Sequence, residues 1–182
     1  TGVNAFALPG GYIYITRGLL SLIENEAEMA GVLAHEIGHV TARHTAQRYS
    51  KAIATNLGLN VVGILGSLYG APAGAGNVLS LGAALYLQGH SREQELEADK
   101  LAVRYLIRAG YDPNAMVTFF KKMQAHSNLQ AKLAGKSDEP DQFHALSTHP
   151  RTEQRIVQAI NLVKLARIKS PRLGRTRLLA AL

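Results

Sequence analysis

The chain has 182 residues, no cysteine and a formal net charge of +7 at neutral pH. This length fits one domain with a sizeable core, and the absence of cysteine excludes a disulfide framework, a thiolate metal site and a cysteine nucleophile. Six basic residues follow position 163, and the part before them has 14 basic against 13 acidic residues. Because no aromatic residues are interleaved with these six, nucleic-acid binding is not expected.

The first predicted elements are two short strands. Residues 3–7 have an extended pattern, residues 9–11 (Pro-Gly-Gly) form a turn, and residues 12–16 alternate bulky side chains as a strand does. A two-stranded ribbon followed by helices predicts an α+β domain that is mainly α-helical with a small sheet. The edge of the second strand is a candidate site for an extended peptide, which would bind by strand addition along Tyr12, Ile13, Tyr14 and Ile15.

A short helix at 17–23 is followed by a long helix that we predict from Glu26 to Lys51. Asn25 and Glu28 have the spacing of a capping box at its start. Its buried face is expected to consist of five apolar residues, Met29, Ala30, Leu33, Ile37 and Val40.

This long helix contains the motif His-Glu-x-x-His at residues 35–39. His35 and His39 are four residues apart, so they share one face of the helix and can direct two imidazoles at one zinc ion. Glu36 lies beside the pair, where a general base acting on a zinc-bound water would have to be. The alternative is two surface histidines and a solvated glutamate, but a buried helix needs partners for such side chains. His44 lies about half a turn from His35 on a continuous helix, which indicates a packing or supporting role.

No charged residue occurs from Ile53 to Gly89. A Gly- and Pro-containing break at 70–74 divides this segment into halves of about 15–17 residues, shorter than the roughly 20 that span a bilayer. We therefore predict two apolar helices of the domain, which could form a mobile lid over the active site. A membrane hairpin and a surface contact with lipid are the alternatives.

Three further helices are predicted from caps and apolar spacing. The first runs from Arg92 to Ala109 after the N-cap residue Ser91, and the second covers about 112–126. Residues 128–147 are polar and predict a loop or partly ordered flap. The last helix begins near 147–150, and its expected buried stripe is Ile156, Ile160 and Val163.

A catalytic zinc needs a third protein ligand, and the helix at 92–109 offers candidates. Glu95 and Asp99 are four residues apart on a face with apolar neighbours, where a carboxylate is costly unless it is paired or binds a metal. Glu93 and Glu97 lie off that face and are expected to be solvated.

Four stretches, in this order, resemble the zinc metallopeptidase family that includes the CAAX prenyl endopeptidases, the HtpX-like membrane heat-shock proteases and the periplasmic outer-membrane quality-control proteases. They are Asn-Ala-Phe-Ala-Leu-Pro-Gly-Gly at 4–11, His-Glu-Ile-Gly-His at 35–39, Glu-Leu-Glu-Ala-Asp at 95–99 and Ser-Thr-His-Pro at 147–150. The resemblance implies a gluzincin-type fold, hydrolysis of peptide bonds and frequent proximity to a membrane.

Matched position by position, the resemblance implies one zinc ion per chain, bound by His35, His39 and Glu95, with Glu36 as the general base. Asp99 would accept a hydrogen bond from a ligand histidine and fix its tautomer. The alternative for Asp99 is a surface ion pair with a neighbouring basic residue, Arg92 or Lys100.

Two residues near the last helix complete the implied site. His149 corresponds to the family's histidine that approaches the metal from the far side, where it occupies the open position at rest or donates to the oxyanion during turnover. Its alternative is an ordinary histidine at a helix start. Arg155, one turn inside that helix, would tie the helix start to the carboxylates of the site.

The sequence thus predicts a zinc endopeptidase domain at 1–163, which acts on unfolded or membrane-associated polypeptides in the bacterial periplasm or at a membrane. Residues 164–182 are predicted to be a basic tail, and a membrane surface or outer-membrane assembly proteins are the expected partners. The alternative from another class is a non-proteolytic, metal-stabilised chaperone or assembly factor that binds membrane proteins through residues 53–89. A third hypothesis is a lipid-anchored scaffold that uses the basic tail.

Overall fold

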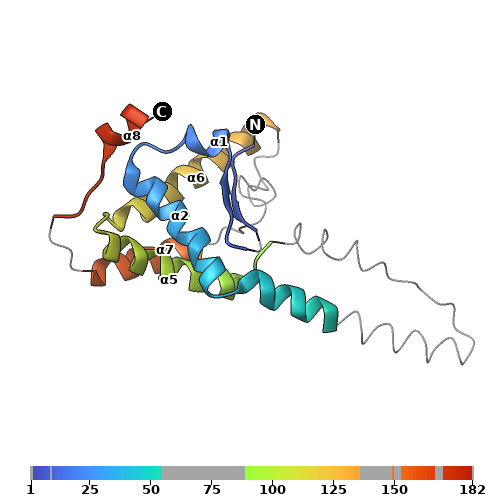
Figure 1. Cartoon of the computed structure of the whole chain (residues 1–182). Coiled ribbons are helices and arrows are strands. Elements are labelled where there is room, and N and C mark those ends of the chain that lie inside the picture. Colours follow the sequence, from blue (N-terminus) through green and yellow to red (C-terminus); the bar gives the residue numbers. More distant parts are fainter. Residues whose placement is uncertain are drawn as a thin grey trace, which may run out of the picture.

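The computed structural model describes residues 2–8, 10–54, 89–135, 149, 153–166 and 170–181. Most of the apolar segment predicted at 53–89 and of the flap predicted at 128–147 lies outside these residues. The described part has a small antiparallel sheet beside a group of helices, so the prediction of a mainly helical α+β domain is confirmed (Figure 1).

The sheet consists of β1 (Ala5–Ala7) and β2 (Ile13–Ile15), which are shorter than the strands predicted from the sequence. Phe6 is opposite Tyr14 in the register, and their rings stack with centroids 5.3 Å apart. The chain reverses through Gly10 and Gly11, whose φ values of 97° and 86° favour glycine. Helix α1 (Arg17–Leu20) follows directly and is capped by Thr16.

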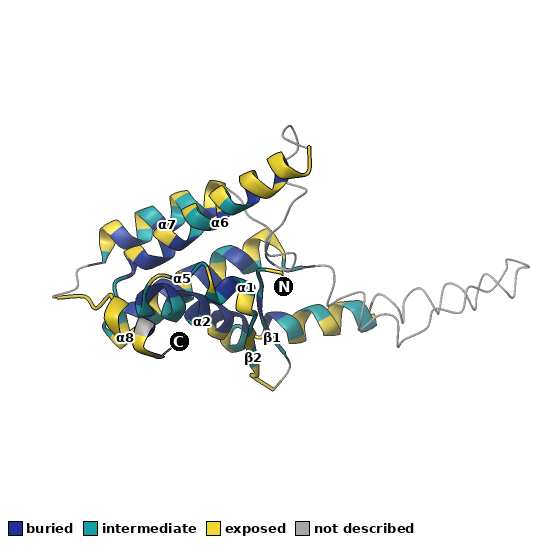
Figure 2. Cartoon of the chain, turned by 90° about the horizontal axis from the view of Figure 1, so that it is seen from above, coloured by how far each residue is buried: buried dark blue, intermediate teal, exposed yellow. Residues whose placement is uncertain are grey.

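Helix α2 (Glu26–Thr41) lies at the centre of the molecule and packs against both strands and against α5, α6 and α8, defined below. The side chain of Asn25 accepts a hydrogen bond from the Glu28 backbone N–H at 2.9 Å, as expected for an N-cap. The Glu28 carboxylate accepts from the Glu24 N–H, one residue before the position that a capping box would use. Figure 2 shows that α2 carries many of the buried residues.

The prediction that this helix continues to Lys51 is wrong. It ends at Thr41, and residues 44–54 form a separate helical segment that projects from the body of the domain (Figure 1). The break occurs because Arg43 has a φ of 57°, in the left-handed region, which interrupts the ladder of helical hydrogen bonds. Neither glycine nor proline marks this break in the sequence.

The predicted buried face of α2 is also wrong, since Ile37 is 41% exposed. The buried face instead combines four small residues with the polar residues of the motif; the small ones are Ala27, Gly31, Ala34 and Gly38. Small side chains let α5 (Arg92–Ala109) approach closely, and a Cβ added at Gly38 would lie 3.0 Å from the carbonyl oxygen of Ala98.

The remaining helices are α6 (Asn114–Leu133), α7 (Glu153–Leu165) and α8 (Arg175–Ala181). Helix α6 extends past the predicted end near position 126, because Met123, Ser127 and Ala131 continue one buried stripe. In α7 the buried stripe differs from the predicted one by including Arg155 and Ala159 together with Val163. None of the described helices is both long enough and apolar enough to cross a bilayer.

Two apolar clusters lie against α2. One joins β1, α1, α2, α6 and α8 through Ala5, Leu19, Ile23, Val32, Phe119, Met123 and Leu178. The other joins α2, α5, α6 and α7 through Ala34, Ala102, Val103, Leu106, Met116 and Val163. Part of the predicted basic tail, residues 164–182, therefore packs on the body of the domain. Leu178 is only 7% exposed, and the Ala27 N–H donates to the Leu173 carbonyl at 3.0 Å.

Replacing Gly38 with alanine should lower the free energy of unfolding by about 1–3 kcal/mol, because the added Cβ meets the backbone of α5 and one of the helices must shift. Gly31→Ala is the matched control in the same helix, since its Cβ would meet side chains and no backbone, with Met116 at 3.2 Å and Leu106 at 3.8 Å. Both variants gain helix propensity equally. Urea unfolding in the presence of a chelator measures the difference, and equal stabilities would contradict the close-packing explanation.

Candidate metal centre

Three side chains from two helices converge at one point. His35 and His39 are one turn apart on α2, and their Nε2 atoms are 3.0 Å apart. Glu95 faces them from α5, with one oxygen 3.3 Å from His39 Nε2 and the other 3.4 Å from His35 Nε2. In a tetrahedral shell with metal–ligand bonds of about 2.0–2.1 Å, neighbouring ligand atoms are about 3.3 Å apart. Each separation is therefore close to that of neighbouring ligands of one metal ion, with each Glu95 oxygen facing one of the two histidines.

His149 adds a fourth donor to this group. Its Nδ1 is 2.9 Å from Glu95 Oε1 and 3.3 Å from His35 Nε2. His149 and the three α2 and α5 residues are all buried, and each offers a ligand atom within 4.8 Å of the others. The structure thus brings together every residue that the sequence analysis assigned to the metal, together with the histidine it placed on the metal's far side.

Glu36 lies beside this group and is 2% exposed. Its Oε1 is 3.2 Å from His149 Nε2, whereas its Oε2 is buried without a hydrogen-bond partner among the described residues. Burial raises the pKa of Glu36, but the charge and hydrogen bond of His149 outweigh burial and lower the pKa to about 2. Glu36 is therefore an ionised carboxylate with one oxygen available to accept a proton.

Arg155 links the two remaining carboxylates of the site. Its guanidinium makes two hydrogen bonds to Asp99, at 2.7 and 2.8 Å, and its Nη1 is 2.6 Å from Glu95 Oε2. Burial would raise the pKa values of both carboxyls, but the charges of Arg155 on Asp99 and of His149 and Arg155 on Glu95 hold them below their ordinary range. Both groups are therefore ionised.

The charges of the buried groups favour a divalent cation. Glu36, Glu95 and Asp99 contribute three negative charges and Arg155 one positive charge, so the cluster has a net charge of −2 when the imidazoles are neutral. Uncompensated buried charge is costly, and a divalent cation between the ligands would neutralise it. The same carboxylates attract positive charge to His149: burial lowers its pKa, but Glu95 and Glu36 outweigh burial and raise the pKa to about 10.

Asp99 sets the orientation of the His35 ring. Its Oδ1 is 2.9 Å from His35 Nδ1, and the side chain is fully buried. This close contact with a carboxylate favours the imidazole proton on Nδ1 and leaves Nε2 free to bind a metal. The surface ion pair with Arg92 or Lys100 that the sequence left open is therefore not formed. Glu93 and Glu97, expected to be solvated, are both exposed.

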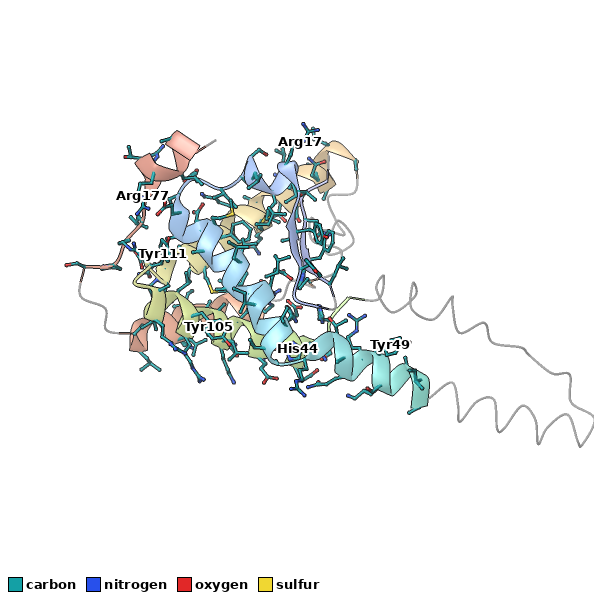
Figure 3. The ribbon with its side chains drawn as sticks, viewed as in Figure 1. Arg17, His44, Tyr49, Tyr105, Tyr111 and Arg177 are labelled. Atoms are coloured by element: carbon teal, nitrogen blue, oxygen red, sulfur yellow. The ribbon has the colours of Figure 1, made fainter. Side chains whose placement is uncertain are left out.

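Two further histidines lie at His39: His44, for which the sequence indicated a packing or supporting role, and His90, which no pattern in the sequence placed there. His44 is fully buried with its Nδ1 2.9 Å from His39 Nδ1, and His90 stacks on the His39 ring with centroids 3.8 Å apart. His44 reaches His39 only because the helix breaks at Arg43, as its position between α2 and the following segment shows (Figure 3). No spacing rule in the sequence indicates that break or the position of His90.

The strand residues expected to bind a peptide lie near this centre. Tyr12 and Tyr14 are 68% and 49% exposed, whereas Ile13 and Ile15 are partly buried. Ala5, which pairs with Ile15, lines an apolar pocket whose wall also includes Glu36 and His149. The sheet is therefore connected to the metal centre through this pocket.

Comparisons with known proteins agree with this arrangement. The model of peptidase family M48 matches residues 1–163. The chain is 38% identical over 165 residues to the beta-barrel assembly-enhancing protease of Escherichia coli O157:H7, covering 87% of this chain and 32% of that protein. It is 36% identical over 154 residues to the mitochondrial metalloendopeptidase OMA1 of Saccharomyces cerevisiae, covering 84% of this chain and 41% of that protein. The chain thus spans less than half the length of these relatives.

Replacing Arg155 with glutamine should lower the free energy of unfolding by about 3–5 kcal/mol, because two buried carboxylates lose their shared cation. Urea unfolding followed by circular dichroism measures the change. Arg177→Gln is the control, because Arg177 is exposed and has one 3.3 Å contact with Glu26, so its effect should stay below about 1 kcal/mol. Similar losses in both variants would contradict the charge balance described above.

Proposed function

The chain belongs to peptidase family M48, and on this premise we propose that it is a zinc-dependent endopeptidase domain that hydrolyses peptide bonds of unfolded or membrane-associated proteins. The observation that carries the proposal is the position of Glu36, an ionised and buried carboxylate beside the donor atoms of His35, His39 and Glu95. Two imidazoles and one carboxylate are a donor set of catalytic zinc sites, which keep a further position open. One zinc ion per chain would also balance the net charge of the cluster.

The proposed mechanism assigns each step to a side chain of this domain. Zinc supplies a Lewis acid, which polarises the scissile carbonyl and makes water at the site more acidic. Glu36 takes a proton from the attacking water, whose oxygen bonds to the carbonyl carbon. Glu36 then passes the proton to the leaving nitrogen as the carbon–nitrogen bond breaks, which gives a carboxylic acid and an amine; transfer of the acid's proton to the amine yields a carboxylate and an ammonium group.

His149 is proposed to act on the carbonyl oxygen. Its Nε2 is 3.2 Å from Glu36 Oε1, and this proximity to the proposed general base supports a role for its N–H in stabilising the negative charge that develops on the carbonyl oxygen. In the resting site its Nδ1 lies within the donor group, where it could serve as a fourth ligand. Asp99 and Arg155 hold the His35 ring and the Glu95 carboxylate in position throughout.

The substrate is proposed to be an extended polypeptide that adds to the edge of β2 along Tyr12, Ile13, Tyr14 and Ile15. Strand addition satisfies the backbone of any sequence, which suits an unfolded substrate. The apolar pocket between Ala5 and Glu36 gives space for an apolar side chain near the scissile bond. We also propose a bacterial periplasmic or membrane-associated location with outer-membrane assembly proteins as partners, and the beta-barrel assembly in the name of the Escherichia coli relative supports the choice of partners.

Replacing Glu36 with glutamine should slow cleavage of unfolded casein by at least about 100-fold, because the general base loses its ability to accept a proton. The variant should retain its zinc, since Glu36 is not among the proposed ligands. Cleavage is followed by gel electrophoresis and zinc by atomic absorption, with the exposed Glu93→Gln as the control. Cleavage at the wild-type rate would remove the mechanism, and protection of unfolded membrane proteins without cleavage by the wild type would favour a chaperone.

Zinc at about 100 times its dissociation constant should raise the midpoint of thermal unfolding by roughly 5–10 °C, because binding to the folded state adds about 2.7 kcal/mol. Differential scanning calorimetry at defined free zinc concentrations measures the shift. His39→Ala should abolish it, whereas His126→Ala on α6, outside the donor group, should leave it unchanged. A shift that persists in His39→Ala would place the zinc elsewhere.

A further inference from the structure

We infer that His44 is a positioning residue for His39, because it accepts a hydrogen bond from His39 Nδ1–H and so fixes the ring that directs Nε2 at the metal. The two Nδ1 atoms are 2.9 Å apart, and His44 is fully buried. The inference rests on the proposed function, since it takes zinc to bind at His35, His39 and Glu95.

The direction of this hydrogen bond follows from the position of His39. Its Nε2 lies in the donor group, 3.0 Å from His35 Nε2 and 3.3 Å from Glu95 Oε1. A neutral imidazole that binds a metal through Nε2 has its proton on Nδ1. His39 is therefore the donor, and His44 Nδ1 must be the acceptor.

Glu97 gives His44 the tautomer that this role requires. Its Oε2 is 3.3 Å from His44 Nε2, so Nε2–H donates to the carboxylate and Nδ1 is left without a proton. The hydrogen bonds thus run from His39 through His44 to a carboxylate whose side chain is 61% exposed. Glu97 and His39 therefore contact different nitrogens of the His44 ring.

The two ligand histidines of α2 are supported in parallel ways. Asp99 accepts from His35 Nδ1, and His44 occupies the corresponding position at His39. On an uninterrupted helix His44 would lie about 140° around the axis from His39 and could not reach its ring edge. The left-handed conformation of Arg43 therefore has a specific consequence, which is to turn His44 back to the metal helix.

A second metal ion is the competing explanation, because nitrogen atoms of His39, His44 and His90 also lie within 4.8 Å of one another. The hydrogen-bond explanation accounts for both nitrogens of His44, since Glu97 is at Nε2 and His39 at Nδ1. The stacked ring of His90 covers a face of His39 and leaves the edge contact to His44. Counting the bound ions distinguishes the two explanations.

The test measures zinc affinity by competition with a chromogenic chelator in the full chain. His44→Phe keeps a ring but has no acceptor, and it should raise the zinc dissociation constant by about 10–100-fold. His44→Asn keeps an oxygen close to the place of Nδ1 and should stay within about fivefold of the wild type. The absorption spectrum of bound cobalt(II) should change in His44→Phe and match the wild type in His44→Asn, because it reports the geometry of the ligands.

Three results would overturn the inference: wild-type affinity and spectrum in His44→Phe, equal losses in His44→Phe and His44→Asn, or two zinc ions in the wild type with one in His44→Phe. If circular dichroism shows that His44→Phe does not fold, a variant at the exposed residue Glu97 tests the inference instead. Glu97→Ala should weaken zinc binding about threefold relative to its matched control Glu93→Ala, and equal affinities would overturn the inference. A wild-type chain that binds no zinc would instead refute the proposed function.

Discussion

The site depends on one electrostatic constraint: three carboxylates, those of Glu36, Glu95 and Asp99, are buried together against the histidines of the site, and Arg155 is the permanent cation that pairs with two of them. Arg155 contacts both Glu95 and Asp99, while Glu36 faces His149. Such a group is stable only where the surrounding helices supply hydrogen bonds and a further positive charge. The uncompensated negative charge of the cluster makes its burial unfavourable, and the same charge gives the cluster affinity for a divalent ion. The stability of the fold and the binding of a metal therefore have one physical origin.

This electrostatic arrangement requires that α2 and α5 approach closely. His39 Nε2 and Glu95 Oε1 are 3.3 Å apart although they come from different helices, and the contact is possible because Gly38 meets the backbone of Ala98. A larger residue at this contact would separate the helices and with them the ligands. The buried face of α2 consequently consists mainly of small and polar residues with Val32 as a larger apolar member, and most of the bulky apolar residues of the core come from the other elements.

The sequence was sufficient where the chemistry depends on local spacing. The four-residue separations of His35 and His39 and of Glu95 and Asp99 place each pair on one helix face, and the mainly helical α+β class followed from caps and apolar periodicity. It was insufficient where a contact depends on backbone conformation. Arg43 has a left-handed φ although it is not a glycine, so its residue type did not predict the break in the helix. The apolar pattern also misplaced the buried face of α2, because periodicity cannot show that burial there favours small residues.

The supports of the two ligand histidines show how metal binding becomes coupled to the fold. Asp99 reaches His35 only while α5 is packed on α2, and Arg155 reaches Asp99 only while α7 is packed on α5. His44 reaches His39 only while the backbone at Arg43 keeps its left-handed conformation. Each ligand orientation is therefore set by tertiary contacts that an unfolded chain lacks, and free energy released on binding a metal adds to the free energy of folding. Changes in helix packing far from the donor atoms should consequently alter metal affinity, and metal binding should in turn order these contacts.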